Sequence, residues 1–300
     1  MYTGPIIDPH FHFWDLSMKK HPWLAPSDGG VQALGGLEKL RHDHLPADYL
    51  AASAGQNIAA TVHIEALWEF GDEIGETLWL ETLDRPAGIA ARYIAAAPFG
   101  TDRAASVIAA QAAVKRVAGI RAVLSNHPHE PARNFAPRDG IAFEPEFRRD
   151  VAKLIDHGLM LELMMYHYQL DGVLDLSRAL PDLRIVVNHC ASPIDRDPAG
   201  MQKWKDSVRA LADRPNIVLK VSNIGAYDPT PTEASVTDVA LHCINSFGPD
   251  RAMLATDWPV AGMHSSFGQL YDEFRRITAG FSASEQRALF HDTARRVYAL

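Results

Sequence analysis

Short apolar runs recur along the chain, and each ends in polar residues. There are eight, at residues 5–8, 58–64, 88–97, 119–124, 159–165, 184–187, 216–221 and 251–255. They are continuously apolar rather than alternating, which is typical of parallel strands covered on both faces. The pattern therefore predicts eight buried parallel strands.

Segments with helical spacing of apolar residues lie between these runs. They span residues 102–117, 147–157, 201–212, 236–247, 267–279 and 284–298, with a shorter helix near Asp48. Residues 282–285 read Ser-Ala-Ser-Glu, which has the form of a helix capping box. Strands that alternate with helices predict a single-domain (β/α)₈ TIM barrel over residues 1–300 rather than a doubly wound sheet. A G-x-G-x-x-G pattern is absent, which argues against a dinucleotide site.

Two connections are long, residues 13–56 after the first run and residues 125–145 after the fourth. Both leave the C-terminal ends of predicted strands, where barrel enzymes place their active sites. Long connections in compact domains are usually functional or disordered, and the aromatic residues in the first favour a packed lid. The charged side chains of the second are expected in solvent or over a substrate.

Composition narrows the class of protein. The chain is 47% hydrophobic and 22% charged, with a net charge of −8, which is typical of a globular protein and argues against nucleic-acid or anionic-membrane surfaces. We find no apolar run near the roughly 20 residues of a membrane span, and no secretory signal. Cys190 and Cys243 lie far apart without CxxC spacing. These features predict a cytoplasmic protein with reduced cysteines.

Imidazole, carboxylate and cationic side chains gather where the predicted strands end. They are His10, His12, His63, Glu65, Arg121, Glu162, His167, His189, Lys220 and Asp257. His10 and His12 are two residues apart on a strand, so their rings share one face and can converge on one ion or substrate atom. Asp257, at the end of the last strand, can complete such a site or take a proton from water. In a closed barrel the first and last strands are neighbours.

Motifs along the whole chain resemble those of a known family. Residues 7–14 read Ile-Asp-Pro-His-Phe-His-Phe-Trp, residues 187–193 Val-Asn-His-Cys-Ala-Ser-Pro, and residues 256–259 Thr-Asp-Trp-Pro. In order and spacing they resemble the amidohydrolase superfamily, in its "amidohydrolase 2" branch of TIM-barrel hydrolases. Asn188 stands where that branch usually has Asp, and Thr256 where it has Ser.

The resemblance is closest to lactonases of sugar acids and carboxylated lactones, such as fuconolactonase and 2-pyrone-4,6-dicarboxylate lactonase. It implies a hydrolase that opens a small lactone, with Asp257 as general base and His189 as a second catalytic residue. His10, His12, His189 and Asp257 would polarise the carbonyl directly or through one divalent metal, with zinc as the expected ion. Because the superfamily's bridging carboxylated lysine has no candidate on the fifth strand, the resemblance leaves one metal at most, and some relatives need none.

The other strand-end residues are candidate substrate contacts. They are Arg121, His63, Glu65, Lys220 and Glu162. A guanidinium can hold a substrate carboxylate through two parallel hydrogen bonds. Two alternatives stay open: Arg121 can pair with a neighbouring carboxylate, and Lys220 can form a buried ion pair with Glu162.

Two other functions also stay open. One is zinc-dependent, non-oxidative decarboxylation of an aromatic or muconate-type acid, which would be favoured by a metal-binding His167 after the fifth strand. The other is a barrel that binds a small molecule without catalysis. In every case the expected partner is a small molecule, and association into a homo-oligomer is an open possibility.

Overall fold

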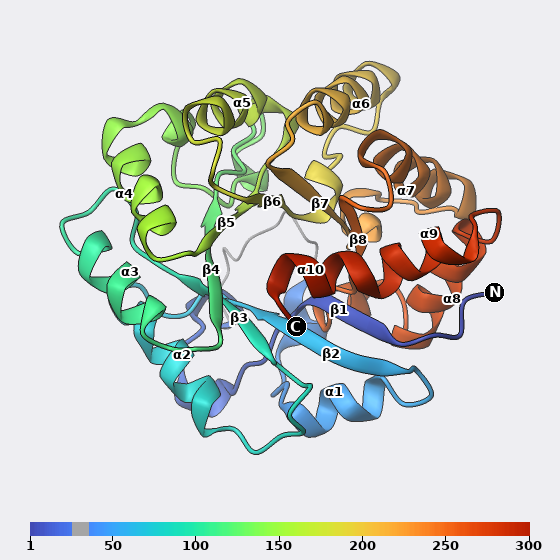
Figure 1. The fold of residues 1–300 in the computed structure, drawn as a ribbon, viewed down its shortest axis with the longest axis horizontal. Helices are drawn as coiled ribbons and strands as arrows, with labels where there is room; N and C mark the ends of the chain where they lie inside the picture. Colours follow the sequence, from blue (N-terminus) through green and yellow to red (C-terminus); the bar gives the residue numbers. More distant parts are fainter. Residues whose placement is uncertain (26–35) are drawn as a thin grey trace.

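The computed structural model describes residues 1–25 and 36–300, and within them eight parallel strands form one sheet in chain order (Figure 1). The strands are β1 (Ile6–Phe11), β2 (Ile58–Ile64), β3 (Arg92–Ala96), β4 (Val117–Val123), β5 (Met160–Met164), β6 (Ile185–Val187), β7 (Ile217–Val221) and β8 (Ala252–Leu254). The sheet closes where His12 N donates to Trp258 O at 2.8 Å and Asp257 N donates to His10 O at 2.8 Å. The predicted TIM barrel is confirmed.

Helices surround the strands (Figure 1). They are α1 (Pro46–Ala52), α2 (Glu73–Thr82), α3 (Ala104–Ala112), α4 (Pro145–Asp156), α5 (Leu170–Ala179), α6 (Pro198–Ala212), α7 (Glu233–Phe247), α8 (Phe267–Ile277), α9 (Ala283–Arg287) and α10 (Thr293–Tyr298). In the described part of the chain, no helix is long and apolar enough to cross a membrane.

Several predicted boundaries were wrong. The helix predicted over 102–117 ends at Ala112, because Val117 already begins β4. The helix predicted over 284–298 is interrupted by a π-helical turn, Ala288–Asp292. The sequence pattern also missed α2 and α5; α2 turns the polar Glu73, Glu76 and Thr77 inward, so its apolar stripe is weak.

The apolar core has two main parts. The larger lies between the strands and the helices, and the smaller fills the barrel with side chains such as Ile7, Val62 and Val186. Tyr298 of α10 joins the inner part, and Arg184, just before β6, donates to Val297 O of α10. Figure 1 shows α10 lying across this end of the barrel. The N-terminal end of the barrel is therefore closed, and the C-terminal end is left for a site.

Candidate active site

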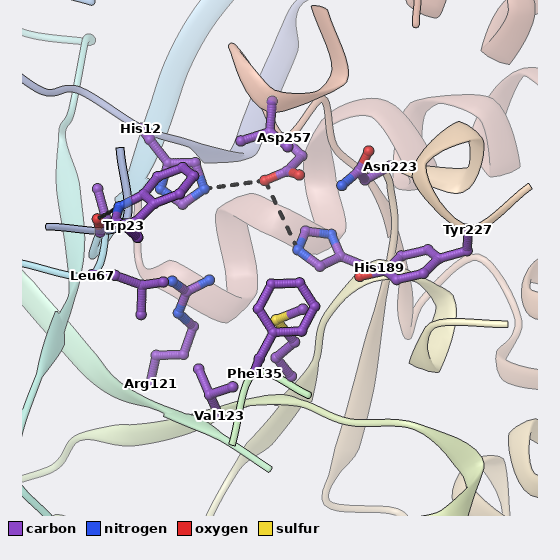
Figure 2. A pocket seen from close by; sticks show the side chains of 13 residues that line it. His12, Trp23, Leu67, Arg121, Val123, Phe135, His189, Asn223, Tyr227 and Asp257 are labelled. Atoms are coloured by element: carbon purple, nitrogen blue, oxygen red, sulfur yellow. Dashed lines mark hydrogen bonds and ion pairs between the residues drawn. The ribbon is translucent and has the colours of Figure 1, made fainter. Parts of the chain in front are cut away.

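A carboxylate and three imidazoles meet at the C-terminal end of the barrel. Asp257 Oδ1 lies 3.2 Å from His10 Nε2, 3.1 Å from His12 Nε2 and 3.9 Å from His189 Nε2. All four side chains are buried, and Figure 2 shows Asp257 between His12 and His189. The structure therefore brings together the four residues that the sequence pointed to.

The backbone beside these residues adopts an uncommon conformation. Asp257 has φ 61°, Asn223 after β7 has φ 49°, and the four residues from His189 to Ser192 have φ between 43° and 57°. Non-glycine residues rarely occupy this left-handed region, and strained residues cluster at functional sites. The strain falls at the ends of β6, β7 and β8, where side chains enter the mouth of the barrel.

The hydrogen bonds of His12 show which of its nitrogens faces the site. His12 Nδ1 lies 2.8 Å from the carbonyl oxygen of Ile64, so Nδ1 carries the proton and Nε2 presents a lone pair. That lone pair faces Asp257 Oδ1 at 3.1 Å. Two acceptors this close repel each other unless a proton or a cation lies between them.

His10 adds a second nitrogen to the same point. His10 Nε2 is buried and makes no hydrogen bond within the described chain. His10, His12 and Asp257 each place one ligand atom within 4.8 Å of the others. Two imidazole nitrogens and a carboxylate oxygen suit a divalent ion with an open coordination position. These residues fit a metal once His10 carries its proton on Nδ1 and gives up the long contact with the Lys220 ammonium.

Burial sets the charges at the site. It lowers the pKa of His12 to about 3 and that of His189 to about 4, and it holds the pKa of His10 well below its usual range. Burial raises the pKa of Asp257 to about 6, against the opposing effect of nearby cationic groups. Near neutral pH the site therefore holds neutral imidazoles and an ionised carboxylate, the state a general base requires.

Two predicted substrate contacts form an ion pair below the site instead. Lys220 Nζ donates to Glu162 Oε2 at 2.6 Å, and both side chains are fully buried. Asn188 Nδ2 donates to the same oxygen at 2.8 Å, and the Tyr298 hydroxyl donates to Glu162 Oε1 at 2.5 Å. Lys220 also makes a long 3.4 Å contact with His10 Nδ1. The pair supports His10 from beneath and does not line the pocket.

Arg121 reaches the pocket, but it is already paired. Its Nε donates to Glu65 Oε1 at 2.5 Å, and its Nη2 donates to the backbone oxygen of Glu65 at 2.8 Å. Glu65 thus lies behind Arg121 rather than in the pocket wall.

The structure does not bring His63 to the pocket. Its ring packs against Phe11, Phe13 and Tyr93 in the layer between barrel and helices. Val62 and Ile64 take the inward positions instead. Because side chains alternate along a strand, His63 must then point outward.

The site opens into a pocket of about 630 Å³, counting the space that opens to solvent. Figure 2 shows several lining residues that sequence reasoning missed, namely Trp23, Leu67, Val123, Phe135, Asn223 and Tyr227. Asn223 lies two residues past the end of β7 at Val221 and could have been found by extending the run at 216–221. Val123 belongs to β4, where only the strand register decides which side chains face the pocket. The others lie in loops, where aromatic and aliphatic residues are usually packing residues.

A second cluster of polar residues holds the loop at 125–145 in place. His127 Nε2 lies 3.0 Å from Asp195 Oδ1, and the backbone N–H groups of His129 and Glu130 donate to His127 Nδ1 at 3.2 and 3.0 Å. A neutral His127 therefore carries its proton on Nε2 and cannot bind a metal through that atom. His167 lies beside the same carboxylate, 3.6 Å from Asp195 Oδ2, and the structure does not bring it to His10, His12 and Asp257.

Comparisons with known proteins cover nearly the whole chain. An uncharacterized protein of Sinorhizobium fredii is 32% identical over 294 residues, 98% of each chain. L-fucono-1,5-lactonase of Burkholderia multivorans is 27% identical, over 98% of this chain and 96% of the relative. Two structures of an amidohydrolase from Burkholderia multivorans, one with bound HEPES and one with bound zinc, have TM-scores of 0.81 and 0.80. The two structures are 24% and 22% identical to this chain in sequence. Each match covers 99% of this chain and 100% of the matched chain.

The amidohydrolase family model matches residues 7–300, from β1, which carries His10, to the last residue. That range includes every residue of the buried site. The chain therefore belongs to the amidohydrolase family.

Proposed function

We propose that this protein hydrolyses the ring ester of a small lactone. The observation that carries the proposal is one buried carboxylate, Asp257, surrounded by three neutral imidazoles at the mouth of an amidohydrolase barrel. The similarity to L-fucono-1,5-lactonase over 98% of the chain supports a lactone as the substrate class.

The residues can divide the chemistry between them. Asp257 Oδ1 faces the imidazoles, while Oδ2 takes part in none of the hydrogen bonds or ion pairs among the described residues. Asp257 can therefore take a proton from water as the water adds to the lactone carbonyl, and return it to the ring oxygen as that oxygen leaves.

The developing oxyanion needs a hydrogen-bond donor. His189 Nδ1 lies 2.9 Å from the Ser222 hydroxyl, which can donate to it and leave the proton of neutral His189 on Nε2, toward the pocket. A fixed donor aimed at developing charge stabilises the transition state. His189 is therefore the proposed oxyanion donor.

We further propose zinc as the metal that His10, His12 and Asp257 would hold. A bound zinc ion would supply positive charge that polarises the carbonyl and lowers the pKa of water. A cation would also relieve the repulsion between the His12 Nε2 lone pair and Asp257 Oδ1.

The test is acid release from a panel of lactones, followed with a pH indicator, using protein purified without a His tag. Zinc-loaded and chelator-treated samples are compared, and metal content is measured in both. We expect acid release that the Asp257→Asn variant loses. If zinc-loaded and chelated protein both release no acid from any lactone, the proposal is wrong.

A further inference from the structure

We infer that the preferred substrate is an uncharged lactone with an alkyl or aryl substituent, rather than a polyhydroxylated or carboxylated one. This inference rests on the proposed function and narrows its substrate class. It follows from the apolar side chains that line the pocket, from the ion pair between Arg121 and Glu65, and from the hollow next to the pocket.

The described walls of the pocket away from the catalytic groups are mostly apolar. Six of the lining residues are aliphatic or phenylalanine side chains, Ala66, Leu67, Val123, Phe135, Met164 and Val260. Figure 2 shows Leu67 and Val123 on the side away from Asn223 and Tyr227. A ring held here lies against hydrocarbon on that side.

Few polar groups of the described lining are free to bind substrate hydroxyls. Trp23 Nε1 already donates to Ala66 O at 2.8 Å. The Asn223 side-chain oxygen and the Tyr227 hydroxyl are buried without a partner, and both lie on one wall. A sugar lactone carries several hydroxyl groups, and each one buried without a partner weakens binding. The pocket therefore suits a ring with few hydroxyls.

Arg121 is partly engaged by a carboxylate of the chain itself. Its Nε and Nη2 atoms donate to Glu65, at 2.5 and 2.8 Å, and Nη1 is left without a partner among the described residues. Both side chains are buried, so the Glu65 charge offsets that of Arg121 at close range. A carboxylated lactone that binds the remaining N–H groups of Arg121 would bring a second negative charge beside the buried Glu65, and one guanidinium cannot neutralise both.

A second hollow on the surface lies next to the apolar side of the pocket. Leu67, Arg121 and Val123 line both spaces. Beyond them the second hollow is lined by four aromatic side chains, Trp68, Phe70, Phe99 and Phe147, and by four charged ones, Glu65, Glu73, Arg138 and Glu144. Phe70 is 77% exposed, so its ring is available to a bound hydrocarbon group. A hydrocarbon substituent that passes Leu67 and Val123 would cover this surface.

The test compares δ-lactones that share one ring. Values of kcat/KM are measured for δ-valerolactone, δ-decalactone, glucono-1,5-lactone and a δ-lactone with a carboxylate substituent. We expect the kcat/KM of δ-decalactone to exceed that of both polar lactones by at least about tenfold, because a buried polar group without a partner weakens binding by about this factor or more. The Val123→Thr variant should lower the ratio of δ-decalactone to δ-valerolactone, because it places a hydroxyl on the substituent's path at similar volume.

Val114→Thr is the matched control, because Val114 lies after α3 and outside both hollows. It should leave the ratio unchanged. A higher kcat/KM for the hydroxylated or carboxylated lactone, or an unchanged ratio in Val123→Thr, overturns this inference and leaves the lactonase proposal standing. Failure to hydrolyse any lactone of the panel overturns both.

Discussion

The Asp257→Asn substitution should make the protein more stable and much less active. Burial raises the pKa of Asp257 from its usual 3.8 to about 6, so the folded protein holds the carboxylate at a cost. One pKa unit corresponds to about 1.36 kcal/mol, so a rise of about 2.2 units corresponds to about 3 kcal/mol. Asparagine has nearly the same shape and no charge, and it removes that cost.

The stability difference between Asp257→Asn and wild type should increase with pH. The pKa of Asp257 is higher in the folded protein than in the unfolded chain, so the folded state binds the proton more tightly. As pH rises from about 4 to about 6 the carboxyl group loses its proton, and the free energy of unfolding falls. Above pH 6 the full cost is present, so Asp257→Asn should raise the free energy of unfolding by about 3 kcal/mol. The difference should vanish near pH 4.

The assay is denaturant unfolding of chelator-treated protein at pH 8 and at pH 4.5, with hydrolysis measured at pH 8. Loss of a general base should lower kcat by about 10²- to 10⁴-fold. Asp182→Asn is the control, since Asp182 is exposed and should change neither quantity. An Asp257→Asn variant that is less stable than wild type at pH 8, or a difference that does not change with pH, would refute the reasoning.

Three further predictions concern the same region. In chelator-treated protein the kcat/KM of hydrolysis should fall as pH drops below about 6, because burial raises the pKa of Asp257 to about 6 and the protonated form cannot accept a proton; a flat pH–rate profile of that protein from pH 5 to 8 would contradict this. Lys220→Met should cost about 3–5 kcal/mol in denaturant unfolding, because Glu162 is left buried without its partner. Adding Glu162→Gln should restore most of that loss, and a double variant as unstable as the single would be evidence against a buried ion pair. His12→Asn should weaken zinc binding in equilibrium dialysis whereas His63→Gln should not, and equal losses would mean that the metal binds elsewhere.

The sequence alone determined the fold and the centre of the site. Continuous apolar runs separated by helical segments specify a parallel barrel, because both faces of each strand must be covered. Within that fold, His10 and His12 share a face by strand alternation, and Asp257 must lie next to them because β1 and β8 close the barrel. These relations follow from local periodicity and strand order.

Only the tertiary structure decided the roles of the remaining polar residues. Arg121 pairs with Glu65 and Lys220 pairs with Glu162, across 56 and 58 residues of sequence, while His63 turns outward. Such contacts depend on strand register and on where each strand begins its alternation, and a shift of one residue reverses the face of every side chain. The apolar pocket wall also depends on how loops such as the one that carries Phe135 fold back over the barrel. Loop conformation is set by contacts between distant parts of the chain, so no local pattern encodes it.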